Sequence, residues 1–165
     1  MKKILSLFSV LCILFFSAIS SAEAVIYSEY DIDVAIQKMN ELASQDLLSF
    51  VNRNELIGFR LENVNMATMQ YQTTVKATAD SLVNMRNRID IVKNSADFSD
   101  SEKNMQINQI YQEADASISN TTSKTVMYLI ELRNSMPTIT YQRYVKKFQE
   151  YYNQLNLGNY QVDVK

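Results

Sequence analysis

Glycine and proline are almost absent from this chain, and this scarcity limits its fold more than any other feature. Among 165 residues only Gly58, Gly158 and Pro137 belong to these two types. An all-β domain of this length needs many turn residues, whereas a long helix excludes both types from its interior. The sequence therefore predicts an all-α fold with few breaks.

Short segments mark two expected breaks and the end of the last helix. Ser99-Asp100-Ser101-Glu102 is a capping-box sequence, in which the serine hydroxyl and the glutamate carboxylate each accept a backbone N–H at a helix start. The polar segment 93–97 before it predicts a turn. Pro137 predicts a second break, because proline fits a first helical turn but not a helix interior. Gly158 fits the residue just past a final helix.

Between these breaks the apolar residues recur in alternating steps of three and four, the pattern of packed helices. Segments 59–94 and 100–134 carry it, and each is about 50 Å long as a helix. Equal lengths joined by a short turn predict an antiparallel helical hairpin. The apolar seams contain Leu61, Val64, Tyr71, Val75, Leu82, Met85, Ile89 and Val92 in the first segment, and Ile107, Tyr111, Ala114, Ile118, Tyr128 and Leu132 in the second.

Two further helices are expected to flank the hairpin. Their apolar stripes contain Ile36, Met39, Ala43, Leu47, Phe50 and Ile57 on one side, and Tyr141, Tyr144, Val145, Phe148, Tyr151, Tyr152 and Leu155 on the other. Gly58 leaves two geometries open. A corner there gives a four-helix bundle. A kink there makes residues 31–94 one rod in an elongated hairpin, whose first helix a partner or second copy must cover.

Threonine occupies four seam positions where leucine packs better: Thr68, Thr78, Thr121 and Thr125. In one interpretation the methyl groups fill narrow layers while each hydroxyl bonds to the carbonyl one turn back. In the other, the polar layers make a soft core that opens to a partner.

The N-terminal residues 1–24 have the three parts of a secretory signal peptide. Lys2 and Lys3 precede an apolar run over 4–16, and Ala22-Glu23-Ala24 is a cleavage pattern. The run is shorter than the roughly 20 residues that span a bilayer, so no stable membrane insertion is expected after cleavage. This predicts export to a bacterial periplasm or beyond, and residues 25–165 as a single domain. The only cysteine, Cys12, lies in the removed segment, so the mature chain forms no disulfide.

Composition excludes several kinds of chemistry. The chain has no histidine, and residues 25–165 have no cysteine, which removes histidine bases, thiolates and tetrahedral zinc sites. The carboxylate groupings, Asp31 with Asp33 and Asp97 with Asp100, stand where helices begin and favour caps over calcium. A net charge of −2 argues against nucleic acid as a partner. No cofactor or metal is expected, and the protein is predicted not to be an enzyme.

The C-terminal tyrosines are the candidate partner-binding residues: Tyr141, Tyr144, Tyr151 and Tyr152, with Arg143 and Lys147. Tyrosine and arginine are enriched at protein interfaces. The stripe is wider than one core contact needs, which indicates an exposed patch. The alternative is that helical spacing places these rings in the core. The tail 159–165 alternates like a short strand that either adds to a sheet edge or frays.

These features together predict an exported, non-catalytic helical interaction module. The favoured role is a component of an envelope, secretion or conjugation assembly, with another protein or a second copy of this chain as partner. The alternative is a periplasmic chaperone-like holdase that binds unfolded envelope proteins. A hydrolase whose carboxylates are brought together by folding is the distant enzymatic alternative.

Overall fold

The computed structural model describes residues 26–56 and 58–155, and within these ranges the regular structure is entirely helical. The α-helices are α2 (Glu29–Ser44), α3 (Phe59–Asn94), α4 (Asp100–Ser135) and α5 (Thr138–Leu155). Two short 3₁₀ helices, η1 (Leu47–Phe50) and η2 (Arg53–Glu55), connect α2 to α3. The predicted all-α fold is confirmed. The signal-peptide residues 1–24 and the tail 159–165 lie outside the described residues.

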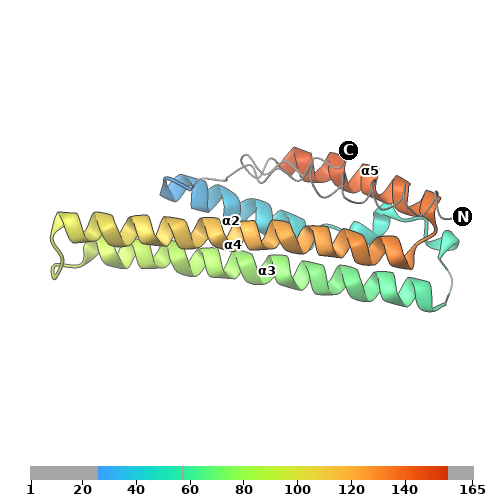
Figure 1. Ribbon diagram of the computed structural model, residues 1–165. Helices are drawn as coiled ribbons and strands as arrows, with labels where there is room; N and C mark the ends of the chain where they lie inside the picture. Colours follow the sequence, from blue (N-terminus) through green and yellow to red (C-terminus); the bar gives the residue numbers. More distant parts are fainter. Residues whose placement is uncertain (1–25, 57, 156–165) are drawn as a thin grey trace, which may run out of the picture.

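The long helices α3 and α4 form the predicted antiparallel hairpin (Figure 1). Each has 36 residues, and the observed bounds differ from the predicted 59–94 and 100–134 by one residue. Near the turn Lys103 Nζ donates to the Lys93 carbonyl at 3.1 Å. Midway along the hairpin the hydroxyls of Thr78 and Thr121 are 2.7 Å apart. These pairs fix the antiparallel register along the hairpin.

Both predicted breaks are confirmed. At the start of α4, Ser99 N donates to Glu102 Oε2 at 2.8 Å and Glu102 N donates to Ser99 Oγ at 3.4 Å, completing the capping box. At its end Met136 N still donates to the Leu132 carbonyl at 2.9 Å. Pro137 follows, and α5 begins at Thr138.

The first flanking helix is shorter than its apolar stripe predicts, and the single rod over 31–94 is wrong. Helix α2 ends at Ser44, and η1 and η2 follow it before α3 begins at Phe59. Gln72 of α3 stabilises this ending, because its Nε2 donates to the carbonyls of Ala43 and Gln45 at 3.0 and 2.6 Å. Gly58 precedes α3 with φ +58° and ψ −136°, a conformation that favours glycine.

Helices α2 and α5 lie on the same side of the hairpin and follow one another along its length (Figure 1). Glu29 at the start of α2 pairs with Arg86, while Ala43 at its end meets Gln72, so α2 runs antiparallel to α3. Helix α5 and η1 cover the opposite part of the hairpin, where α5 runs back along α4. The molecule is therefore an elongated hairpin whose third layer is shared by two shorter helices.

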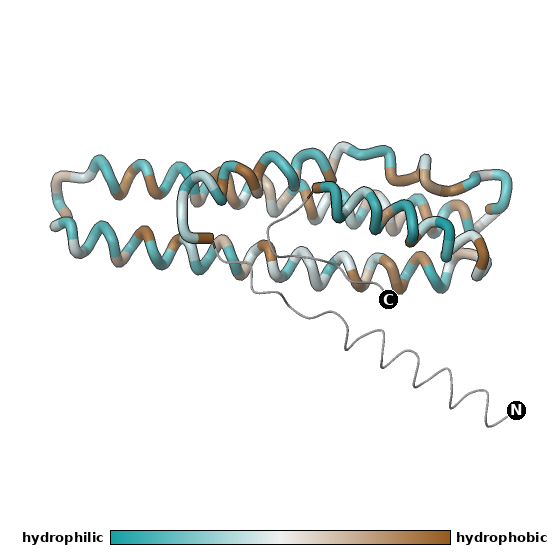
Figure 2. Tube along the Cα trace, turned by 90° about the horizontal axis from the view of Figure 1, so that it is seen from above, coloured by the Kyte–Doolittle hydropathy of each residue, from teal (hydrophilic) through white to brown (hydrophobic). Residues whose placement is uncertain are grey.

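The core runs along the seam that the sequence predicts, and Figure 2 shows apolar residues recurring at intervals along the helices. Most predicted seam positions of α3 and α4 are buried, and Leu61, Met85 and Tyr111 are partly buried. The heptad pattern missed four further buried residues, Ala67, Ala79, Ile110 and Leu129. These widen the seam so that it faces the third layer as well as the partner helix of the hairpin.

Candidate interaction surface

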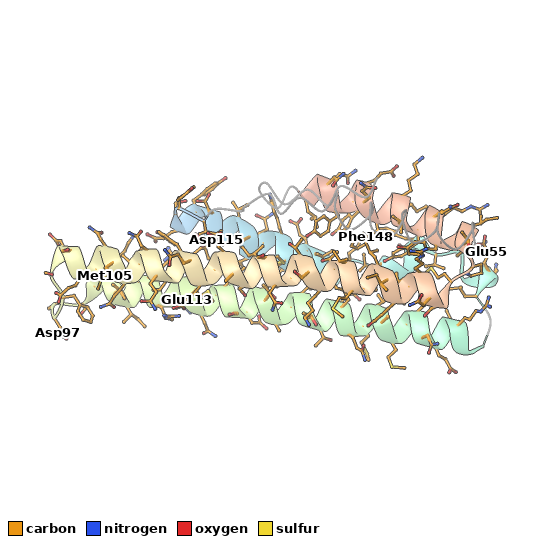
Figure 3. The ribbon with its side chains drawn as sticks, in the orientation of Figure 1. Glu55, Asp97, Met105, Glu113, Asp115 and Phe148 are labelled. Atoms are coloured by element: carbon orange, nitrogen blue, oxygen red, sulfur yellow. The ribbon has the colours of Figure 1, made fainter. Side chains whose placement is uncertain are left out.

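A cluster of aromatic rings fills the space between α5 and the hairpin. The rings of Tyr71 and Tyr128 stack in parallel, with centroids 4.4 Å apart. From α5, Phe148 lies with its ring centroid 6.0 Å from that of Tyr128 and 5.7 Å from that of Tyr152. Figure 3 shows Phe148 between α5 and the hairpin. This aromatic cluster joins α5 to both long helices.

A chain of hydrogen bonds runs through this cluster. The Tyr144 and Tyr128 hydroxyl oxygens are 2.6 Å apart, and Tyr128 lies 3.0 Å from Thr68 Oγ1. Thr68 Oγ1 in turn lies 2.8 Å from the Val64 carbonyl, which can only accept. Since each hydroxyl has one proton, the direction is fixed: Tyr144 donates to Tyr128, Tyr128 to Thr68 and Thr68 to Val64. The chain links three helices.

The threonine seam is hydrogen-bonded in the way that the first interpretation predicts. Thr125 Oγ1 donates to the Thr121 carbonyl at 3.0 Å. Thr78 and Thr121 each lie 3.2 Å from a carbonyl one turn back and 2.7 Å from each other, so one of the two hydroxyls donates to the other and the second donates to its carbonyl. Tyr71 also donates to Thr125 Oγ1 at 2.9 Å. These cross-helix bonds were not predicted. Buried polar groups that find partners avoid the cost of desolvation, so these layers hold the closed form together.

Burial raises the pKa of the phenols in this cluster. Desolvation raises the pKa of Tyr71 and Tyr144 well above the ordinary value for tyrosine, and it raises the pKa of Tyr128 and Tyr152 in the same direction. A phenol with a raised pKa is protonated near neutral pH and donates a hydrogen bond. The cluster is therefore a structural element in the interior.

The structure separates the predicted partner-binding residues into buried and surface groups. Tyr144 and Tyr152 are only 1 % and 2 % exposed, so their predicted place on an exposed patch is wrong. With Phe148 they recur every four residues, which places all three on the face of α5 that meets the hairpin. Tyr141 and Tyr151 are half-buried at the flanks of this face.

Arg143 and Lys147 lie exposed on α5, beyond this buried face. Arg143 Nη1 pairs with Glu55 Oε1 at 3.0 Å, and Thr140 Oγ1 donates to the other carboxylate oxygen at 2.5 Å. The bond from Thr140 is the main cause that lowers the pKa of Glu55. Arg143 thus connects α5 to η2. The surface part of the predicted patch consists of Tyr141, Tyr151 and Lys147 beside this pair.

The hairpin end, defined as residues 87–112, presents apolar side chains that the sequence analysis did not single out. Ile91 is 69 % exposed and Met105 is 66 % exposed, and Phe98 stands exposed in the turn. A shallow groove between the two helices is lined by Arg88, Ile91, Val92, Gln106, Gln109 and Ile110. Figure 3 places Met105 and Asp97 at the opposite end of the molecule from Glu55. The sequence signal for this surface was Ile91, an apolar residue that stands next to Val92 but outside the heptad steps.

A cluster of charges marks where α2 begins on the hairpin. The Arg86 guanidinium lies 2.8 Å from Glu29, 3.3 Å from Asp33 and 2.6 Å from Asp90. The hydrogen bond that Arg86 donates to Asp90 is the main cause that raises the pKa of Arg86. Lys93 pairs with Glu29 as well. The cluster overlaps the start of the hairpin end, and Figure 1 shows the two long helices projecting beyond α2.

The described part of the chain contains no group of three or more Asp, Glu, His or Cys side chains placed to hold a metal ion. Over the same ranges, none of the helices combines the length and the apolar character needed to cross a membrane. The exposed surfaces described above are the hairpin end and the outer face of α5. The chain matches no family model, and comparisons with curated proteins and with solved structures found no match either.

Proposed function

We propose that this protein is an exported, non-catalytic interaction module that contributes a protein-binding hairpin end to an envelope, secretion or conjugation assembly. The observation that carries the proposal is the exposure of Ile91 and Met105 on the two helices of the hairpin end, beside grooves lined by polar side chains. Large apolar side chains exposed among polar ones are a feature of interaction sites when they form a patch.

Helices α2 and α5 cover a different face of the hairpin from the groove. Helix α2 covers α3 from Lys93 to Gln72, and α5 covers the part around Tyr128. Ile91 lies on another face of α3, beside Arg88, which pairs with Glu113 across the groove. We propose that a helix from a partner protein covers this face.

The lining of the groove defines the chemistry of that partner helix. Ile91, Val92 and Ile110 offer an apolar strip, and Gln106 and Gln109 offer amides that both donate and accept. Arg88 is already paired with Glu113 at 2.5 Å. An amphipathic helix with apolar and uncharged polar side chains fits this surface, in the helix-in-groove mode of recognition.

The opposite part of the molecule supports the hairpin end mechanically. The aromatic cluster and its hydrogen bonds join α5 to both long helices, and Arg143 joins it to η2. A helix of 36 residues is about 54 Å long. The protein thus presents its hairpin end at the tip of a supported rod.

Export is proposed from residues 1–24, which lie outside the described residues. The two lysines, the apolar run and Ala22-Glu23-Ala24 support it. The absence of enzymatic activity stays a prediction.

The test is site-specific photocrosslinking in intact cells, with the crosslinker at Ile91, at Lys147 on α5 and at the exposed control position Lys124 on α4. One dominant adduct at Ile91, weak at the other two positions, supports the proposal. A dominant adduct at Lys147 instead moves the binding surface to α5 and contradicts the hairpin end as the site.

A matched pair of variants sharpens this test. Ile91→Asp removes an apolar contact from the hairpin end, whereas Ile139→Asp makes the same change at a 64 % exposed position on α5. Both variants should fold, because neither side chain is buried. Only Ile91→Asp should abolish the adduct formed by a crosslinker placed at Met105. Equal loss in both variants would argue against a specific site.

The holdase is the second candidate, and four exposed methionines favour it: Met66, Met69, Met105 and Met127. Methionine is flexible and polarisable, which suits surfaces that bind many sequences. A holdase yields many adducts from every crosslinking position, and these increase when envelope proteins unfold. It also suppresses the aggregation of an unfolded client in a purified system.

A further inference from the structure

The outer side of α4 carries no exposed charge over much of its length. From residue 104 to residue 123, about 30 Å of helix, every exposed side chain is an amide, a hydroxyl, methionine or alanine. Glu113 is partly buried and pairs with Arg88 of α3. Asp115 is also partly buried and accepts the Ile26 N–H at 2.8 Å, and Figure 3 shows it on the side of α4 that faces α2. The polar side of a surface helix normally carries charged residues, so this stretch is unusual for a face that meets only water.

The residues along the middle of this face form a stripe that is nearly symmetric about Ala116. Side chains at equal distances before and after Ala116 are of the same kind, apolar with apolar and uncharged polar with uncharged polar. The pairs are Gln112 and Asn120 at four positions, Gln109 and Ser123 at seven, and Met105 and Met127 at eleven. Steps of three and four residues keep them on one line along the helix. All of them are exposed, and together with Ala116 they are called the α4 stripe.

A second copy of this chain fits the α4 stripe. In a two-fold symmetric dimer each copy contributes the same surface, so that surface has to be complementary to itself. A two-fold axis beside Ala116 and perpendicular to α4 makes the second helix antiparallel and exchanges the two halves of the stripe. Met105 of one copy then lies opposite Met127 of the other, so flexible apolar side chains meet at both ends. The small side chain of Ala116 allows the two backbones to approach at the centre.

Charge and hydrogen bonding favour this partner. An amide both donates and accepts, so glutamine and asparagine can bond to their own kind, whereas a charged group repels its own copy. Covering the stripe takes no ion out of water, which avoids the large desolvation penalty of a buried charge. Antiparallel packing is favoured over parallel packing, because it places the long Gln109 opposite the short Ser123 and sets the helix dipoles in opposite directions.

We propose that the α4 stripe is the interface of a homodimer, in which α4 of a second copy lies antiparallel to it with Ala116 at the two-fold axis. The inference goes beyond the proposed function, because Ile91 lies on α3 and outside the stripe, while Met105 and Gln109 stand where the two surfaces adjoin. The contact uses one helix from each copy over about 33 Å, so it belongs to the small, reversible class of interfaces. The dimer presents its two hairpin ends in opposite directions, and together with the proposed function this makes the module bivalent.

The test is sedimentation velocity of the full chain as isolated from cells, at concentrations from about 1 µM to about 1 mM. We expect a reversible monomer–dimer equilibrium. Ala116→Glu sets two like charges against each other at the axis, so it should raise the dissociation constant by about tenfold or more. Ala77→Glu makes the same change at an exposed alanine on α3 and should leave the dissociation constant unchanged. Both variants should fold, because both positions are exposed and glutamate is a good helix former.

A protein that stays monomeric over this range of concentrations overturns the homodimer. Equal weakening of the dimer by Ala116→Glu and Ala77→Glu overturns the α4 stripe as its interface. A dimer weakened by Ala116→Glu alone supports the proposal.

The antiparallel register is tested with two chains that each have one cysteine, both made with Cys12→Ser. One carries Met105→Cys, the other carries Met127→Cys, and a short bismaleimide joins thiols that lie close together. A mixture of the two chains should crosslink. Neither chain alone should do so, because identical positions lie about 33 Å apart in the antiparallel dimer. Crosslinking of either chain by itself, or no crosslinking of the mixture, overturns this register.

The outcomes separate this inference from the proposed function. A crosslink between two copies has twice the mass of the chain, whereas the adduct expected at Ile91 contains a different protein. A monomeric protein that still gives the Ile91 adduct overturns the homodimer alone. A dimer that gives no such adduct overturns the hairpin end as a binding site and leaves the homodimer in place.

Discussion

The hydroxyl oxygens of Tyr144 and Tyr128 lie 2.6 Å apart, and this contact joins α5 to the long hairpin. Tyr128 also meets Thr68 on α3 at 3.0 Å, so one phenol connects three helices. Two hydroxyls that share a buried bond each depend on the other for a partner. The stability of the packing of α5 therefore depends on groups that a purely apolar core does not need.

The Tyr128→Phe variant tests this chain of bonds. It leaves the Tyr144 hydroxyl without its acceptor and Thr68 without one donor, so the free energy of unfolding should fall by about 1–3 kcal/mol. Urea unfolding followed by circular dichroism measures the change. Tyr27→Phe, at an exposed tyrosine, is the control and should have no effect. Equal stability of the two variants would contradict the buried network.

The Tyr152→Ala variant tests where the C-terminal tyrosines lie. A ring that is 2 % exposed leaves a cavity when it is removed, so the free energy of unfolding should fall by about 3–5 kcal/mol. Tyr30→Ala, at an exposed ring on α2, should change it by less than about 0.5 kcal/mol. Thermal melts of the two variants measure the difference. Similar melting temperatures of the two variants would contradict the burial of Tyr152.

Alkaline pH should destabilise the protein through the buried phenols of Tyr71, Tyr128, Tyr144 and Tyr152. Their pKa values are raised in the folded state, whereas in the unfolded chain they ionise near pH 10. Above about pH 10 the unfolded state binds fewer protons than the folded state, so stability falls as pH rises. Below that pH these groups cause no pH dependence. Urea midpoints from about pH 9 to about pH 11 measure the effect, and a flat profile contradicts it.

The Gly58→Ala variant tests the turn before α3. No atom lies within 4 Å of the position that a Cβ would occupy, so any cost comes from the backbone, at φ +58° and ψ −136°. This conformation is strained for other residues, so stability should fall by about 1–3 kcal/mol. Gly58→Asn should fare no better, because asparagine tolerates positive φ mainly at ψ near +47°. Chemical denaturation measures the free energy of unfolding of both variants. A Gly58→Ala variant more stable than the original protein would show that the turn adopts another conformation.

The sequence predicted the parts of the fold that local chemistry controls. The capping box at Ser99 and Glu102 defines the start of α4 within one turn, and Pro137 separates α4 from α5 because its ring excludes a helix interior. The heptad pattern between these breaks gave the two long helices and most of their buried residues. Each of these signals acts over a few residues, so no knowledge of distant contacts was needed.

The sequence misjudged features that depend on residues far apart in the chain. The stripe from Ile36 to Phe50 looks continuous, but α2 ends at Ser44, where Gln72 satisfies its last carbonyls. Tyr151 and Tyr152 are adjacent in the sequence, and the apolar periodicity alone does not predict which of the two rings is buried. The position of the hairpin decides that Tyr152 points inward while Tyr151 packs against Phe50, with ring centroids 5.9 Å apart.

What the sequence by itself determined is the helical hairpin, its ends and its seam, because propensity, capping and periodicity are properties of short segments. The tertiary structure decided how α2 and α5 divide the third layer and which tyrosines are buried. It also decided that Ile91 and Met105 remain exposed at the hairpin end. Those outcomes depend on how the apolar stripes of several helices pack on the limited surface of the hairpin. Which residues are buried there is determined by contacts between distant segments, not by the sequence of any one segment.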